Sequence, residues 1–127
     1  MSQPAAYDYA VIRVVPRVER EEFLNVGVIL SCPSKNFLDA AIDLDERKLT
    51  ALYPEVDLDS IKTHLSVIPT ICAGGNSAGE IGRLSQRERF HWLVAPRSTI
   101  IQTSAVHTGK CHDAREALNH LMTMMVK

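Results

Sequence analysis

The sequence predicts an α+β fold: a mainly antiparallel sheet of about four strands covered by helices, in the order β-β-β-α-α-α-β-α. Two observations lead to this prediction. Runs rich in β-branched residues occupy the first third of the chain, and helix-like apolar spacing with capping residues dominates the rest. A chain of 127 residues corresponds to one domain with its own core, so we expect a single domain over residues 1–127.

The stretch 7–32, YDYAVIRVVPRVEREEFLNVGVILSC, predicts the hairpin on which the fold is built. Two apolar runs flank a charged connection at residues 17–21, which is the pattern of a β-hairpin. The first run is apolar on both faces, so we expect an interior strand. In the second run, Gly27 indicates a bulge or a close approach by another backbone or a ligand. Strict alternation would place Leu24, Val26, Val28 and Leu30 on one face and Phe23, Asn25, Gly27, Ile29 and Ser31 on the other.

A third strand is predicted at residues 37–44. Asp39 and Asp43 fall on one of its faces, so that side should lie in water. Because three successive strands are joined by short links, they should form an antiparallel meander.

Helices dominate the remainder of the chain. Asp45 and Asp57 are typical N-cap residues, and Ser85 with Glu88 forms a capping-box pattern. The last segment carries one continuous apolar face, as expected for an amphipathic helix. The predicted elements are helices at 45–53, 57–73, 85–93 and 113–127, with a fourth strand at 99–106 followed by a turn at 107–110.

Composition narrows the classes of function. The formal charge of −1 argues against a protein that coats nucleic acid. Residues 83–97 are basic but carry no nucleic-acid-binding signature, so nucleic acid is not the favoured partner. No apolar run approaches the roughly 20 residues of a membrane helix, and the N-terminus has no signal-peptide pattern. Cys32, Cys72 and Cys111 are widely spaced, which favours reduced thiols in a cytoplasmic protein.

Two polar residues interrupt the apolar strands of the hairpin, Arg13 and Asn25. A buried arginine needs acceptors, which a carboxylate, backbone carbonyls or a bound anion can supply. One interpretation is an internal Arg–Asn–Asp network that ties the sheet together. The other is a polar floor for a ligand. The sequence leaves both open.

A second group of candidates lies in the stretch 87–108, RERFHWLVAPRSTIIQTSAVHT. Its Arg-Ser-Thr triplet follows a proline at a helix-to-strand junction, where a guanidinium, hydroxyls and backbone N–H groups suit a phosphate or carboxylate. The alternative is a polar loop whose hydroxyls satisfy local turns. The anion- or partner-binding candidates in this stretch are Arg87, Arg89, Arg97, Ser98, Thr99, Gln102 and His107.

Metal and cofactor sites are not predicted. His107, Cys111 and His112 are close in sequence, but their spacing matches no structural zinc pattern. A Cys–His nucleophile pair is equally unsupported, because no orienting third residue is evident. We therefore expect no metal and no cofactor.

Three blocks of the sequence, YDYAVIRVVP, EFLNVGVIL and APRSTIIQTSAVHTG, together resemble a bacterial domain-of-unknown-function family of small proteins. The match covers nearly the whole chain. The resemblance implies no established activity. Genes of this family often lie beside genes for kinases similar to the persister-toxin kinase, which implies an accessory or antitoxin-like role with a kinase as partner.

Two hypotheses of function follow. The leading one is a small cytoplasmic binding or accessory protein that engages a protein partner, with a kinase of a toxin–antitoxin-like system as first candidate. The alternative is an enzyme acting on a phosphate-bearing substrate, a nucleotide or nucleic acid, with Arg13, Arg87, Arg89 and Arg97 holding phosphates and His107 as acid or base. The alternative requires Arg13, Arg97 and His107 to converge on one open cleft.

Overall fold

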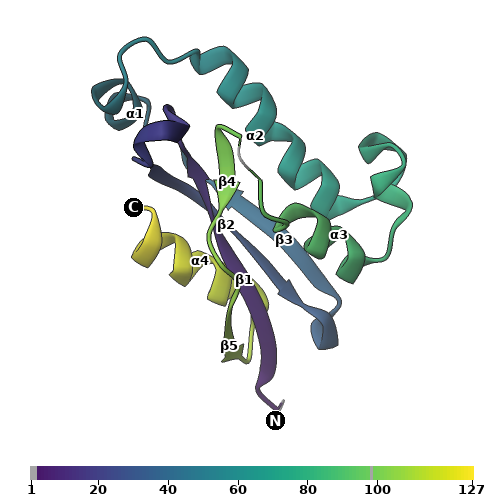
Figure 1. The fold of residues 1–127 in the computed structure, drawn as a ribbon. Coiled ribbons are helices and arrows are strands. Elements are labelled where there is room, and N and C mark those ends of the chain that lie inside the picture. Colours follow the sequence, from purple (N-terminus) through teal and green to yellow (C-terminus); the bar gives the residue numbers. More distant parts are fainter. Residues whose placement is uncertain (1–2, 98) are drawn as a thin grey trace.

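Within residues 3–97 and 99–127, which the computed structural model describes, the protein has the predicted α+β architecture (Figure 1). The strands form one antiparallel sheet in the order β3-β2-β1-β4, and β5 pairs with the other end of β1. The long β1 is therefore the interior strand that the sequence predicts. The strands are β1 (Ala5–Val14), β2 (Leu24–Cys32), β3 (Phe37–Ile42), β4 (Ile101–Thr103) and β5 (His107–Cys111).

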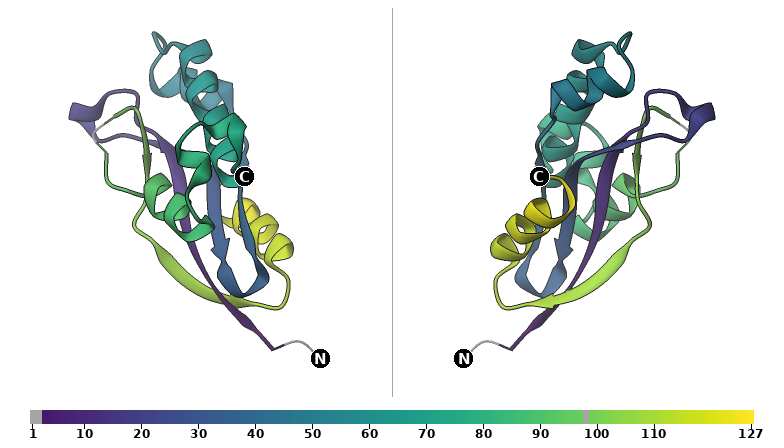
Figure 2. Two further views of the ribbon diagram at one scale, coloured as in Figure 1. Left: turned by 90° about the vertical axis from the view of Figure 1, so that its right-hand side faces the viewer. Right: turned by 90° about the vertical axis from the view of Figure 1, so that its left-hand side faces the viewer.

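Helices cover the two faces of the sheet (Figure 2), with α2 and α3 on one side and α4 on the other. Both α2 and α3 begin at predicted capping residues: Asp57 accepts a hydrogen bond from the Ser60 N–H, and Ser85 and Glu88 form the capping box. None of the described helices is long and apolar enough to cross a membrane. Their bounds are α1 (Glu46–Leu52), α2 (Leu58–Ala73), α3 (Gln86–Leu93) and α4 (Ala114–Met125).

Two apolar cores hold these layers together. Ile12 and Phe90 belong to the core between the sheet and the α2 and α3 helices. Leu30 and Leu118 belong to the core between the sheet and α4. The helix α4 packs chiefly on β2 and β3. On the same face of the sheet, β1 and β4 are therefore less covered.

The predicted fourth strand is divided in the structure. Its residues form the short β4, and the predicted turn at 107–110 is instead part of β5. The division falls at Ser104, whose Oγ accepts a hydrogen bond of 2.8 Å from the Val11 N–H. A side chain thus replaces a backbone carbonyl in the ladder, and the chain leaves β1 before pairing with it again.

The predicted faces of β2 are wrong in part, because the strand contains a β-bulge. Ile12 pairs with Gly27 but Arg13 pairs with Asn25, so Val26 is the extra residue. The bulge changes the alternation, and Val26 packs on the α2 side while Val28 packs on the α4 side. The prediction of a bulge or close approach at Gly27 is confirmed, since a Cβ there would lie 2.5 Å from the Ala41 carbonyl oxygen.

Stability should fall in alkaline solution because of Cys72, a buried residue of α2. Burial, with a smaller contribution from Asp39, raises the pKa of its thiol from 9.0 to about 12. The unfolded chain therefore loses this proton at a lower pH than the folded chain, and stability present below about pH 9 is lost as the pH rises toward 12. We expect Cys72 to lower the free energy of unfolding by about 1 kcal/mol between pH 8 and pH 10.

Urea denaturation of the wild type and of Cys72→Ala at the two pH values measures this contribution. Tyr7 and Cys111 also have raised pKa values, so both proteins should lose stability in alkali. The variant should lose less of it, because its cavity cost does not depend on pH. Equal losses of unfolding free energy between the two pH values in the wild type and in Cys72→Ala would contradict the prediction.

Candidate functional site

A row of three polar side chains crosses the sheet at the end of β1. The register places Arg13 opposite Asn25 of β2 and opposite Gln102 of β4. Residues directly opposite one another in antiparallel strands share a face, so all three lie on the α4 face. The Asn25 Nδ2 donates to the carbonyl oxygen of Met125 at the end of α4, at 3.1 Å. The row therefore begins where the covering helix ends.

The guanidinium of Arg13 lacks the internal partners that a structural arginine would have. Its Nε is buried and has no hydrogen-bond partner among the described residues. None of the ion pairs found in that part of the chain includes Arg13. Its Cζ lies 4.1 Å from the centroid of the Phe23 ring, a cation–π contact. The Oδ1 of Asn25 is likewise buried with no hydrogen-bond partner in the described part of the chain. The described residues thus do not form the internal Arg–Asn–Asp network.

Arg13 borders an open pocket of about 350 Å³. The pocket lies between the connection of the β1–β2 hairpin and the segment that leads into β4, which Figure 2 shows side by side. We call it the hairpin-tip pocket. Its lining residues are Arg13, Val15, Val18, Glu21, Phe23, Arg97 and Gln102.

Arg97 is the second cation of the hairpin-tip pocket, and α3 holds it in place. Its Nη1 donates to the Leu93 carbonyl oxygen at 3.0 Å and its Nη2 to that of Trp92 at 2.7 Å. Such bonds satisfy the free carbonyls of a helix C-terminus. The one acidic residue of the lining, Glu21, is exposed and has a positive φ of 59°. The lining therefore retains an excess of positive charge.

Two predicted arginines lie elsewhere. Arg87 donates to Asp8 at 2.5 Å and to the Ser31 hydroxyl at 3.1 Å, so it ties α3 to the sheet. Arg89 is 9% exposed and donates to the carbonyl oxygens of Leu84 and Cys72. Both side chains are engaged in internal contacts, and neither lines the hairpin-tip pocket.

His107 and the hydroxyl candidates are also placed apart from Arg13. His107 lies on β5, with its ring centroid 5.5 Å from that of Tyr9. Thr99 donates through Oγ1 to the Ile101 carbonyl oxygen at 2.8 Å and faces α2 rather than the pocket. Ser98 lies outside the described residues. In the described ranges, no group of three or more His, Cys, Asp or Glu side chains is placed to hold a metal ion.

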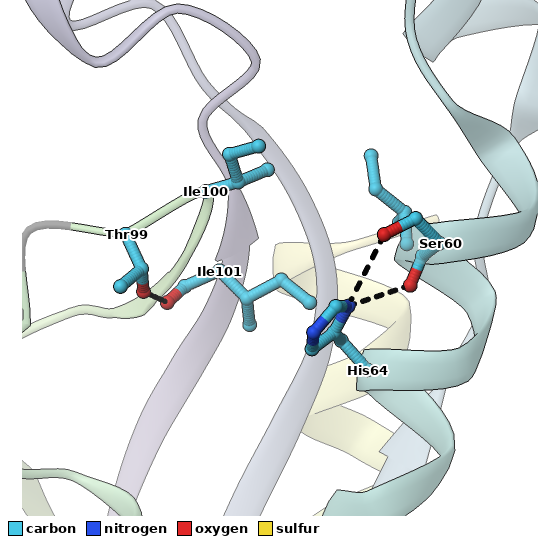
Figure 3. Close-up of a pocket in the computed structure, with 6 residues that line it drawn as sticks. Ser60, His64, Thr99, Ile100 and Ile101 are labelled. Atoms are coloured by element: carbon cyan, nitrogen blue, oxygen red, sulfur yellow. Dashed lines mark hydrogen bonds between the residues drawn. The ribbon is translucent and has the colours of Figure 1, made fainter.

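A second hollow lies on the α2 side of the same segment (Figure 3). One part, of about 430 Å³, is lined by Ser60, Ile61, His64, Thr99, Ile100 and Ile101. A neighbouring part, of about 210 Å³, shares His64 and extends to Val67 and Trp92. We call the two parts the α2–β4 groove. Sequence reasoning missed it, although Val67 is an apolar residue on the otherwise polar outer side of α2.

The fold and the site thus define a small α+β domain with an arginine-lined pocket at one end of its sheet. The chain belongs to the DUF3037 family, described as a protein family of unknown function, whose model matches residues 9–126. No curated protein and no solved structure matches the chain.

Proposed function

We propose that this protein is a small binding or accessory protein that engages a protein partner through the hairpin-tip pocket. The observation that supports this most directly is the guanidinium of Arg13 in the pocket lining, whose buried Nε has no partner among the described residues. The Nε of Arg89 is also unpaired there, but the other two nitrogens of that guanidinium donate to carbonyl oxygens, whereas none of the ion pairs of the described residues includes Arg13. Burying a charged group is costly unless it is paired. An anionic group from outside, placed in the pocket that Arg13 and Arg97 both line, would pair with the charge of the Arg13 guanidinium.

The rim of the pocket favours a protein as the source of that group. Phe23 and Val18 are 46% and 38% exposed, and both border the two arginines. Arginine and aromatic residues are enriched at the centres of protein interfaces, where they contribute most of the binding energy. A partner that places a carboxylate in the pocket can cover these apolar side chains at the same time.

A kinase is the first candidate for the partner. The sequence resemblance associates this family with genes for kinases similar to the persister-toxin kinase. We propose an accessory or antitoxin-like role in the cytoplasm on that basis. The chemistry of the pocket adds that the partner should present an acidic group.

Affinity capture from cells at native expression tests the proposal. Tagged wild-type protein should recover one stable partner, and Arg13→Met should not. Arg17→Met is the matched control, because Arg17 lies at the same hairpin tip but is exposed and paired with Glu19 at 2.9 Å. Recovery of no stable partner by the wild type, or equal recovery by Arg13→Met, would count against the proposal.

The alternative function, an enzyme acting on a phosphate-bearing substrate, has less support. The hairpin-tip pocket brings Arg13 and Arg97 together, as this hypothesis requires. Its acid or base, His107, lies on β5 against Tyr9 and not in that lining. The two arginines of the lining suit an anion, which supports binding without supplying the acid or base that this hypothesis assigns to His107.

A further inference from the structure

Exposed apolar side chains gather around one segment of the protein. Seven large apolar residues are exposed in the described chain, and five of them line either the hairpin-tip pocket or the α2–β4 groove. Single exposed apolar residues are normal, but a cluster marks an interaction site. The five are Val18 and Phe23 in the pocket and Val67, Trp92 and Ile100 in the groove.

The pocket and the groove are adjacent. Arg97 and Gln102 line both, because the segment that carries them separates the two hollows. Arg97 also lies over the Trp92 ring, with its Cζ 4.5 Å from the ring centroid. A ligand could therefore pass from the cationic pocket to the apolar groove over a surface made of Arg97 and Trp92.

The groove offers apolar contact together with a hydrogen-bond acceptor. The His64 Nδ1–H donates to the Ser60 carbonyl oxygen at 2.7 Å, which makes Nε2 of the neutral ring an acceptor. Figure 3 shows this imidazole directed from α2 toward β4, where Ile101 extends toward it. Apolar side chains and backbone N–H groups are what an extended peptide segment presents.

We propose that the hairpin-tip pocket and the α2–β4 groove form one docking surface for an extended segment of the protein partner. An acidic residue of this segment pairs with Arg13 and Arg97, and neighbouring apolar residues cover Val67, Trp92 and Ile100. Charge complementarity at the pocket and the two residues that line both hollows support this occupant. The inference rests on the proposed function and names the chemistry of its partner.

Site-specific photo-crosslinking in the full-length protein at native expression tests the inference. Benzoylphenylalanine is placed at Phe23 in the pocket, at Val67 in the groove, and at Lys110 as a control. Lys110 is exposed and pairs with Ala6 at the opposite end of β1. We expect adducts from Phe23 and Val67 with the same short segment of one protein, rich in acidic and apolar residues, and no such adduct from Lys110.

Two variants separate this inference from the proposed function. Val67→Glu places a carboxylate in the apolar groove and should weaken partner binding at least about tenfold. The variant should fold, because Val67 is an exposed residue of α2. If Arg13→Met abolishes partner capture but Val67→Glu does not, and only Phe23 forms adducts, the proposed function stands and the single docking surface is overturned. Adducts with a nucleic acid, or with different proteins from the two positions, would overturn it as well.

Discussion

Arg13→Met is expected to abolish partner binding while leaving the free energy of unfolding equal to that of the wild type or up to about 2.5 kcal/mol higher. Removing the unpartnered Nε relieves a desolvation cost of about 1–3 kcal/mol, against about 0.5–1 kcal/mol for the lost cation–π contact with Phe23. Truncating one member of a buried charge pair costs about 2–5 kcal/mol of binding, which is at least about 30-fold in affinity. Urea denaturation and calorimetric titration with the captured partner measure the two effects.

Arg87→Met is the matched control for this experiment. Arg87 pairs with Asp8, whose side chain is only 20% exposed, and donates to Ser31. Its loss leaves these groups unpaired, so the unfolding free energy should fall by about 1–2 kcal/mol while partner binding is retained. A larger loss of stability in Arg13→Met than in Arg87→Met would show that Arg13 belongs to an internal network.

The different positions of the arginines explain why sequence alone predicts this site only in part. Arg87 and Arg89 are two residues apart on α3, so they point in widely different directions. One reaches the sheet and the other reaches the end of α2. Their closeness in sequence favours a common anion-binding site, whereas helical geometry separates the side chains. Arg13 and Arg97 are far apart in the sequence, and the fold brings them into the lining of the same pocket.

Gly109 shows how a strand can have the composition of a turn. The segment His-Thr-Gly-Lys has turn-like residues, yet it pairs with β1 as β5. A Cβ at Gly109 would lie 2.5 Å from the Tyr7 hydroxyl oxygen, so the aromatic side chain occupies the space over the glycine. This cross-strand packing depends on a residue about 100 positions away. Local propensity contains no information about it.

The bulge in β2 is the other feature that composition could not place. Strict alternation would pair Arg13 with Val26 and turn Asn25 toward the apolar α2 core. Because Val26 is the extra residue, Asn25 instead lies opposite Arg13. Gly27 indicated an irregularity, but the residue that bulges depends on the packing of β2 against β3. The row of polar residues across the sheet is therefore a consequence of tertiary structure.

Gly27→Ala is expected to lower the free energy of unfolding by about 2–4 kcal/mol. The added Cβ would lie 2.5 Å from the Ala41 carbonyl oxygen and 3.0 Å from the Ile12 Cδ1, at the centre of the sheet. A backbone oxygen in a ladder cannot move without breaking strand pairing, so β2 and β3 must separate locally. Urea denaturation monitored by circular dichroism measures the loss.

Gly109→Ala is the matched control, since a Cβ there also meets an atom at 2.5 Å. That atom is the end of the Tyr7 side chain, which can rotate away, so the cost should be less than half as large. Gly27→Ala should also weaken partner binding beyond its effect on folding, because shifting the bulge moves Asn25 away from Arg13. Equal losses of stability in the two variants would contradict the view that the fixed backbone beside Gly27 maintains the bulge.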